Sequence, residues 1–299
     1  MFVVKYRKIW FALSGLILLI SFYAMYAYGF NLSIDFKGGT ITEVKYVERP
    51  DKSALEAEIT KLGLGGFSIR PSGETSYVIR TRELNQSENQ ALQRSLAVGQ
   101  LSTIERQNTI GPVAGAELES KAVKAIAVVV IMIMLFITFA FRKVSKPVSS
   151  WKYALSTIIA LAHDVIIPTG IFVWLGYLAG YEIDLLFVSG LLAILGYSVH
   201  DTIVVFDRVR ENLGVNMDKR INEEFETTVG KSVSQTIGRS INTSLTTFIL
   251  LLALYFAGPA ATKQFALLLA IGIIVGTYSS IFVASPLLVT FHKLQKGSK

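Results

Sequence analysis

Two aspartates interrupt long apolar stretches of this sequence, where a carboxyl group is rare. Asp164 lies close to the middle of one apolar segment, and Asp201 lies toward one end of the next. An aspartate at the centre of a membrane helix costs about 2.5–3.5 kcal/mol on the insertion scale, and such groups normally face the bundle interior, in buried pairs or ion paths. Asp201 is therefore either a structural hydrogen-bonded or ion-paired group or a proton carrier.

Arg239 lies where a later apolar segment begins. Its side chain either extends to the membrane surface or turns inward to the bundle. A guanidinium group close to a carboxyl group favours the ionised form of that carboxyl. A movable Arg239 would therefore switch Asp201 between holding and releasing a proton.

One histidine precedes each aspartate, His163 before Asp164 and His200 before Asp201. Successive helix residues point about 100° apart, so we do not expect His163 and Asp164 to form one ligand pair. His163 with Asp164 is a proton relay or otherwise a packing or bridging group, and His200, on a different face from Asp201, is expected at an interface. Acidic and imidazole residues do not recur at i, i+3 or i, i+4 within an apolar segment, so we predict no metal site and no cofactor other than the proton.

Polar residues continue from Arg239 into its apolar segment. Their expected role is hydrogen bonding between helices, and the alternative is lining a hydrated path. This polar stripe consists of Ser240, Asn242, Thr243, Ser244, Thr246 and Thr247. Small residues in two other segments should let helices pack closely: Gly190, Gly196, Gly272 and Gly276.

The elements that position these residues are membrane helices. Mean hydropathy is +0.49, 52% of the 299 residues are hydrophobic and 17% are charged, against roughly 25% charged in an average soluble chain. A bilayer core needs about 20 apolar residues of helix. Six segments qualify: 9–30, 123–141, 153–177, 185–206, 241–257 and 264–291. The first exceeds the roughly 7–15 residues of a signal-peptide core, so we expect a retained helix.

Basic residues give the orientation, because Lys and Arg concentrate in cytoplasmic loops. Basic residues precede the first segment, follow the sixth and occur throughout the connections 142–152 and 207–239. The other two short connections, 178–184 and 258–263, contain only one basic residue, Lys263. We therefore predict cytoplasmic termini, a first helix within 1–30, an extracytoplasmic domain at 31–121 and helices two to six within 122–299. The basic groups include Lys5, Arg7, Lys8, Arg142, Lys143, Lys146, Lys152, Arg208, Arg210, Lys219, Arg220, Lys231, Lys293, Lys296 and Lys299.

The extracytoplasmic segment has the pattern of a small α+β domain. Residues 40–47 alternate polar with apolar, which is typical of a strand, and 51–62 have helical spacing with Asp51 or Ser53 as cap. Strands at 66–70 and 76–82, joined by a turn at 71–73, a helix at 84–98 and a strand at 101–110 follow. This order predicts a ferredoxin-like domain between the first and second membrane helices.

Enzyme motifs are missing: the sequence contains no Walker motif, no HExxH and no GxSxG. The adjacent glycines of 35–40 (DFKGGT) are a weak phosphate-loop signal, and we interpret them as a tight turn where the chain leaves the membrane. The net charge of +7 comes from the basic residues of the expected cytoplasmic loops and does not indicate nucleic-acid binding. With no cysteine, the sequence allows neither disulfides nor thiol ligands.

Five motifs in this order resemble the SecD/SecF family of bacterial protein-export subunits, which is related to the RND transporters. They are 35–40 (DFKGGT), 111–118 (GPVAGAEL), 161–165 (LAHDV), 196–212 (GYSVHDTIVVFDRVREN) and 235–247 (QTIGRSINTSLTT). The resemblance is poor at 214–226 and in the body of 31–121. It implies an RND-type six-helix bundle, with the family's intramembrane aspartate at Asp201 and its arginine at Arg239.

The resemblance also implies a function. SecF-like chains pair with SecD and use the proton-motive force, without ATP, to help unfolded preproteins move outward past the SecYEG channel of the bacterial cytoplasmic membrane. The site residues would be Asp201, Arg239 and Asp164, supported by His163, Asn242, Thr243 and Thr247. Two alternatives stay open: a proton-driven exporter of a small molecule, and a passive assembly subunit of the translocase.

Overall fold

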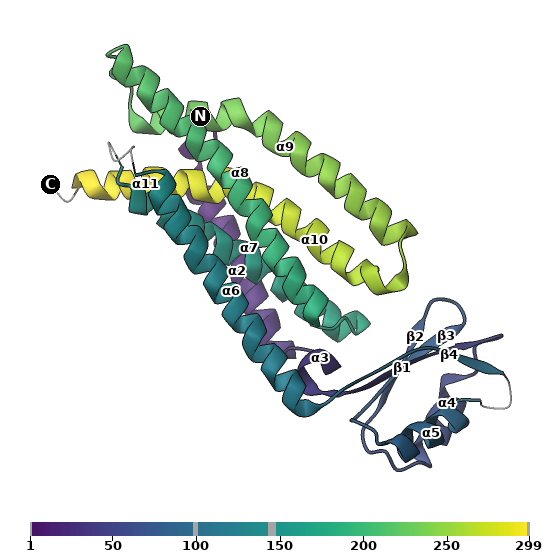
Figure 1. Cartoon of the computed structure of the whole chain (residues 1–299). Helices are drawn as coiled ribbons and strands as arrows, with labels where there is room; N and C mark the ends of the chain where they lie inside the picture. The colour runs from purple at the N-terminus through teal and green to yellow at the C-terminus, as the bar shows by residue number, and fades with distance from the viewer. Residues whose placement is uncertain (1, 98–100, 143–147, 298–299) are drawn as a thin grey trace. The chain divides into compact units, whose positions relative to one another are not determined.

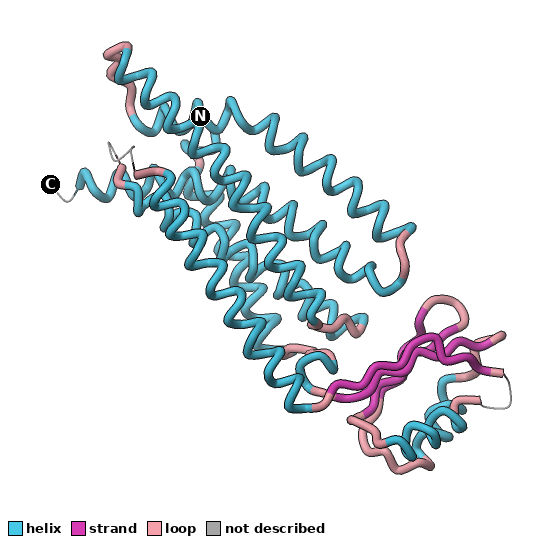
Figure 2. The backbone as a smooth tube through the Cα atoms, viewed as in Figure 1, coloured by secondary structure: helices cyan, strands magenta, loops and turns pink. Residues whose placement is uncertain are grey.

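The computed structural model describes residues 2–97, 101–142 and 148–297, which are mostly helical with one small sheet (Figures 1 and 2). Val98, Lys143, Lys146 and Lys299, to which the sequence predictions assign a helix end and basic charges, lie outside the described residues. The chain forms two compact units. A helical unit contains Met1–Asn31, Ala125–Glu182 and Leu186–Lys299, and an α+β unit contains Leu32–Lys124 and Ile183–Leu185.

Within the described residues, six helices are long and apolar enough to cross a membrane. Each contains one of the six predicted segments or nearly all of it. They are α2 (Arg7–Tyr28), α6 (Pro112–Ala140), α7 (Ser150–Ala179), α8 (Leu185–Asp218), α9 (Phe225–Ala257) and the run Thr262–Gln295. That run lies within α10 (Ala260–Ser279), a π-helical turn η1 (Ser280–Ala284) and α11 (Ser285–Gly297), and a short α1 (Phe2–Lys5) precedes α2.

Several helices extend beyond the apolar segments. Residues 207–239, expected as a connection, are largely helical, because α8 continues to Asp218 and α9 begins at Phe225. Similarly, α6 begins at Pro112, where the fixed φ of proline suits a first helical position. Hydropathy marks only the apolar part of a helix, and polar residues of good helix propensity continue it.

Three of the six helices form the inside of the helical unit. At least half of the apolar stretch of α7, of α8 and of the last run is buried, against less than a fifth for α2, α6 and α9. Glycines bring α8 and α10 close together, since a Cβ atom at Gly272 would lie 2.2 Å from Cδ1 of Ile194 and one at Gly190 would lie 2.6 Å from Leu268. The predicted close packing is confirmed at these positions, whereas Gly196 faces open space.

The π-turn η1 interrupts the last membrane helix just before Pro286. Proline has no N–H for the carbonyl four residues earlier, and its ring crowds that turn. The hydroxyl of Ser285 donates a hydrogen bond to the carbonyl of Ser280 (2.9 Å), across the π-turn. Local irregularity at this point follows from the sequence.

The α+β unit contains a four-stranded antiparallel sheet in the order β2-β3-β1-β4. Helices α4 and α5 lie on the same face of the sheet (Figure 1). Their shared core includes the fully buried Leu55, Ile59, Ile79 and Leu92. The elements are α3 (Ile34–Lys37), β1 (Gly39–Tyr46), α4 (Lys52–Thr60), β2 (Ser68–Ser72), β3 (Ser76–Thr81), α5 (Gln86–Ser95) and β4 (Ser102–Ile110).

Most of the helices, strands and caps predicted for the α+β unit from local sequence patterns agree with the structure. Asp51 is the N-cap of α4, as one of the two predicted candidates. The turn predicted at 71–73 is wrong, because Pro71 and Ser72 belong to β2 and the turn follows them. Proline is tolerated there since β2 is an edge strand.

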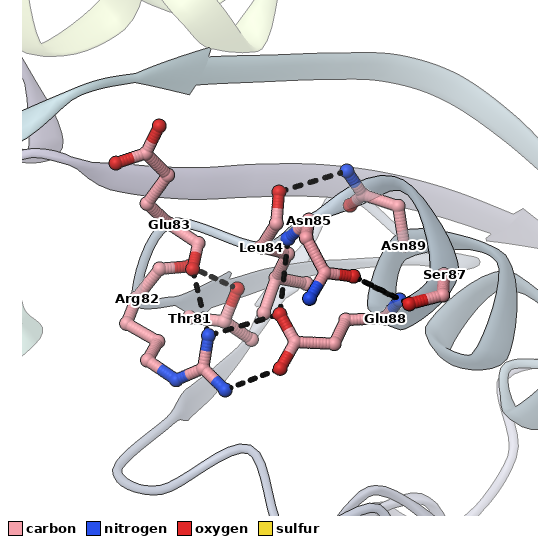
Figure 3. A network of polar contacts seen from close by, with 8 residues as sticks. All are labelled: Thr81, Arg82, Glu83, Leu84, Asn85, Ser87, Glu88 and Asn89. Carbon is pink, nitrogen blue, oxygen red and sulfur yellow. Dashed lines mark hydrogen bonds and ion pairs between the residues drawn. The ribbon is translucent and has the colours of Figure 1, made fainter.

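Helix α5 begins with a reciprocal capping box (Figure 3). Asn85 Oδ1 accepts from the N–H of Glu88 (2.9 Å), and Glu88 Oε2 accepts from the N–H of Asn85 (3.0 Å). Arg82 donates to both carboxylate oxygens of Glu88 (3.0 and 2.6 Å). These contacts hold the pKa of Glu88 at about 2, with the hydrogen bond from Arg82 as the largest cause.

Candidate functional site

Asp164 on α7 lies at the centre of the helical unit and is fully buried. Its carboxylate accepts three hydrogen bonds from three elements. Ser198 of α8 donates to Oδ2 (2.5 Å), Ser279 of α10 donates to the same oxygen (2.6 Å), and Nδ1 of His163 lies 2.9 Å from Oδ1. The carboxylate therefore joins α7, α8 and α10.

His163 and Asp164 are in contact. The 100° offset of adjacent helix residues argued against one ligand pair and left a proton relay or a packing or bridging group, and in the structure Nδ1 and Oδ1 are within hydrogen-bond distance. The offset describes the Cα–Cβ directions, and both side chains turn along the helix surface toward each other. His163 is therefore part of the Asp164 site.

The other ring nitrogen of His163, Nε2, is buried and has no hydrogen-bond partner among the described residues. The ring stacks on Tyr278 of α10, with centroids 5.9 Å apart. The hydroxyl of Tyr278 lies 3.1 Å from that of Ser14 and donates to the carbonyl of Trp10 (3.3 Å), both on α2. Asp164 is thus connected to α2 through its hydrogen bond with His163, the stacking of His163 on Tyr278, and the hydrogen bonds of the Tyr278 hydroxyl.

Asp201 on α8 is also buried, with 8% of its surface exposed. Ser240 of α9 donates to Oδ1 (2.6 Å), and Ser280 donates to Oδ2 (2.5 Å). In the described part of the chain, Asp201 forms no ion pair with a Lys, Arg or His. A carboxyl group buried among neutral hydroxyl donors is the kind of intramembrane group that marks ion paths.

The two aspartate sites share one short segment, Ser279-Ser280, where α10 gives way to η1. Because adjacent residues point in different directions, Ser279 reaches Asp164 and Ser280 reaches Asp201. Sequence analysis missed both serines. A signal existed, since adjacent serines followed by Ser285 and Pro286 are typical of an irregular membrane helix.

Arg239 does not lie beside Asp201. Its side chain is exposed on α9 and makes no hydrogen bond or ion pair within the described residues, and its neighbour Ser240 contacts Asp201 instead. The expected contact between Arg239 and Asp201 is therefore not formed within this chain. Successive positions of a helix face different directions, so only one of the two can point into the bundle.

The polar stripe of α9 divides into two faces. Ser240 and Ser244 are buried and bond across helices: Ser244 contacts Thr277 of α10 (2.5 Å) and accepts from Tyr197 of α8 (3.1 Å). The remaining members, Asn242, Thr243, Thr246 and Thr247, are exposed or half-buried. The hydroxyls of Thr246 and Thr247 bond to the carbonyl of Thr243 on their own helix.

His200 is exposed on α8, and the described residues contain no group of three or more His, Asp or Glu side chains that could hold a metal ion. The chemistry that this arrangement offers is acid–base chemistry at two buried carboxyl groups and one imidazole.

Family models match most of the chain. The model described as "Protein export membrane protein SecD/SecF, C-terminal" matches residues 84–294, and the model described as "SecD/SecF GG Motif" matches residues 23–47. The second match contains the adjacent glycines Gly38 and Gly39.

Individual proteins that this chain resembles in sequence or in structure belong to the same family. The protein translocase subunit SecF of Thermobaculum terrenum is 38% identical over 97% of this chain and 93% of its own length. The protein translocase subunit SecDF of Thermus thermophilus is 34% identical over 92% of this chain but only 37% of its own length. The crystal structure of SecDF, a translocon-associated membrane protein, superposes with a TM-score of 0.84 at 32% identity, covering 97% of this chain and 38% of that one. The chain thus belongs to the SecD/SecF family of protein-export membrane proteins.

Proposed function

We propose that this chain is a membrane subunit of the Sec protein translocase that, together with SecD, uses the proton-motive force to promote export of unfolded preproteins. The observation that carries the proposal is the pair of buried carboxyl groups, Asp164 and Asp201, connected by Ser279-Ser280. Membership of the SecD/SecF family supports the pathway. The longer relative SecDF, of which this chain covers 37%, supports SecD as the partner.

The proposal includes an orientation. Both termini lie in the cytoplasm, the chain crosses the bacterial cytoplasmic membrane six times, and residues 31–121 form a ferredoxin-like domain on the outer side, near the SecYEG channel and emerging substrate. The strand order β2-β3-β1-β4 supports this domain assignment, and the basic cytoplasmic connections support the orientation. The proton is the coupling ion, and neither ATP, another cofactor nor nucleic acid takes part.

Each polar group has a proposed role. Asp201 binds and releases the proton, and Asp164 with His163 forms a second proton-binding group. Arg239, Asn242, Thr243 and Thr247 act from the poorly buried side of α9, which faces SecD. Polar groups on a membrane helix are expensive toward lipid, so a protein partner on this side is expected.

Two proton-binding groups suit the energy requirement. One proton falling through about 100 mV releases roughly 2.3 kcal/mol. Moving a two-state domain from 1:99 to 99:1 needs about 5.5 kcal/mol. One proton therefore biases such a movement, and two protons nearly complete it.

The test uses vesicles that contain this chain, SecD and the channel. Asp201→Asn should abolish proton flux and proton-dependent export, and Asp164→Asn should reduce both. Asp207→Asn is the matched control, because Asp207 lies on the same helix but is exposed and paired with Arg210 at 2.6 Å. Unaltered flux and export in Asp201→Asn would refute the carrier role and leave a passive assembly subunit. Failure to co-purify with SecD or the channel would instead favour a small-molecule exporter.

A further inference from the structure

The hydroxyl of Ser280 has two acceptors within hydrogen-bond distance. It lies 2.5 Å from Oδ2 of Asp201 and 3.1 Å from the backbone carbonyl oxygen of Thr277, which belongs to the preceding turn of the same helix. A serine hydroxyl has one proton to donate. It can therefore give a full hydrogen bond to the carboxylate or to the carbonyl, but not to both at once.

The preceding residue repeats this arrangement at the other carboxyl group. The hydroxyl of Ser279 lies 2.6 Å from Oδ2 of Asp164 and 3.1 Å from the carbonyl oxygen of Gly276. Serine hydroxyls in helices commonly reach a carbonyl three or four residues earlier. Here the same hydroxyls also reach a buried carboxylate, so each aspartate has a serine with an alternative acceptor.

The second serine at each carboxyl group is different. Ser240 donates to Oδ1 of Asp201, and Ser198 donates to Oδ2 of Asp164. Within the residues that the structure describes, neither hydroxyl has another acceptor. If one of these serines had to accept a hydrogen bond from its aspartate, its own O–H would be left buried without a partner, which is unfavourable.

This difference matters because a carboxyl group changes its hydrogen bonding when it takes up a proton. An ionised carboxylate only accepts, whereas a protonated carboxyl group also donates through its O–H. A donor in a buried site needs an acceptor. Oγ of Ser280, at 2.5 Å from Oδ2 of Asp201, can be that acceptor once its own proton points to the carbonyl of Thr277.

We propose that Ser280 is a positioning residue whose hydroxyl reverses its hydrogen bond each time Asp201 takes up or releases a proton, and that Ser279 does the same for Asp164. While Asp201 is ionised, the Ser280 O–H donates to Oδ2. When a proton from the aqueous phase binds to Oδ2, the new O–H donates to Oγ of Ser280, and the Ser280 O–H turns to the carbonyl of Thr277. On release the carboxyl O–H bond breaks, the proton returns to the aqueous phase and the serine hydroxyl turns back.

Only hydrogen atoms change position in this exchange, so the buried donors at Oδ2 keep a partner in both states. This role of Ser280 rests on the proposed function, because it takes Asp201 as the group that carries the coupling proton. It adds to that function the reason why a buried carboxyl group can exist in both forms without rearrangement of the helices around it.

Ionisable groups on the neighbouring helices do not contact Asp201 within the described residues. Arg239 of α9 is exposed, and Tyr278 of α10 bonds to α2. On α7, His163 and Asp164 are hydrogen-bonded to each other. The hydrogen bonds of Asp201 are therefore left to neutral hydroxyl groups in both of its states.

Infrared spectroscopy of the full chain in vesicles with SecD tests the reversal directly. The C=O stretch of a protonated carboxyl group moves to higher frequency when its O–H loses its acceptor. The band of protonated Asp201 is the one that Asp201→Asn removes from the difference spectrum between low and high pH, and Ser280→Ala should move it to higher frequency. Ser285→Ala is the matched control and should leave the band in place, because the Ser285 hydroxyl contacts the carbonyl of Ser280 and neither aspartate.

Proton flux in vesicles that contain the full chain, SecD and the channel provides the second measurement. Ser280 is fully buried, so a larger residue strains its surroundings. Threonine and valine have nearly the same shape, and this strain is therefore common to Ser280→Thr and Ser280→Val. A threonine hydroxyl in a helix also reaches the carbonyl three or four residues earlier. Ser280→Thr should therefore carry about tenfold more proton flux than Ser280→Val, which corresponds to about 1.4 kcal/mol in the barrier. Co-purification with SecD shows that both variants are folded.

Three results would overturn the role of Ser280: an unshifted Asp201 band in Ser280→Ala, an equal shift in Ser285→Ala, or equal flux in the threonine and valine variants. If neither of those two variants co-purifies with SecD, the band in Ser280→Ala still decides. Failure of the proposed function looks different, since Asp201→Asn would then remove no band and leave proton flux unchanged.

Discussion

Aspartate–serine contacts occur in both units of this protein, with opposite surroundings. In the α+β unit, Asp51 is exposed and accepts from the hydroxyl (2.8 Å) and the N–H of Ser53, two residues away, and these hydrogen bonds lower its pKa. In the helical unit, Asp201 is buried and accepts from Ser240 and Ser280 on two other elements. Water competes for the first contact and not for the second. The same pair of residue types is thus a local helix cap in one unit and a link between helices in the other.

Removing a buried carboxylate should have the largest effect. Asp164→Ala leaves two serine hydroxyls and an imidazole without their acceptor, and each buried polar group left unsatisfied costs about 1–3 kcal/mol. Unfolding of the helical unit by SDS in mixed micelles measures the loss. Asp207→Ala, an exposed ion pair, should change the midpoint by at most about 1 kcal/mol. Equal effects of the two variants would end the distinction between buried and exposed carboxylates.

Loss of a buried leucine should destabilise the α+β unit more than the helical unit, which is the reverse of the order expected for loss of an aspartate. Leu55→Ala in the α+β core should destabilise that unit by about 2–5 kcal/mol, because the transfer and cavity terms add. Leu268→Ala, equally buried on α10 against Gly190, should cost less, since lipid is as apolar as leucine and only packing is lost. Hydrogen exchange of the sheet amides and SDS unfolding of the helices provide the two measurements. A larger loss for Leu268→Ala would contradict the expectation.

Losing one exposed helix cap should have a smaller effect. Asn85→Ala removes the acceptor for the N–H of Glu88 and should destabilise α5 by about 0.5–2 kcal/mol. Hydrogen exchange in the first turn of α5 reports it in the full-length protein. Gln90→Ala, exposed on the same helix, serves as the control and should leave exchange unchanged.

The smallest expected effect depends on pH. The pKa of Glu88 is lowered to about 2 in the folded protein, whereas a free glutamate titrates near 4.3. Ionised Glu88 therefore stabilises the fold above about pH 4.3, and this contribution is lost as the pH falls toward 2. Glu88→Gln should remove that part of the pH dependence from sheet-amide exchange. An unchanged pH profile would show that the contact with Arg82 contributes nothing.

The sequence predicted the elements well because their signals are local. Apolar runs identify the membrane helices, period-two alternation identifies β1, and an acidic cap identifies the start of α4. Asp164 and Asp201 could be singled out as sites because a carboxyl group in an apolar run is conspicuous by itself.

Partners of these residues could not be predicted, because they depend on how each helix is rotated about its axis. One step along α9 separates exposed Arg239 from buried Ser240, and one step along the last helix separates the donor to Asp164 from the donor to Asp201. The contact between Asp35 and Leu185 joins segments 150 residues apart. Motif spacing contains no information about such a pairing.

The π-turn at Ser280–Ala284 also constrains how the length of the last helix can change. A π-turn holds one residue more than an α-helical turn, so losing one residue there would leave a regular α-helical turn with the residues beyond it on nearly the same face. Leu288 and Val289, both fully buried, would then keep their neighbours. The same deletion within the regular helix α10 would rotate everything beyond it by about 100°, and should therefore be far more damaging than a single-residue deletion in the π-turn.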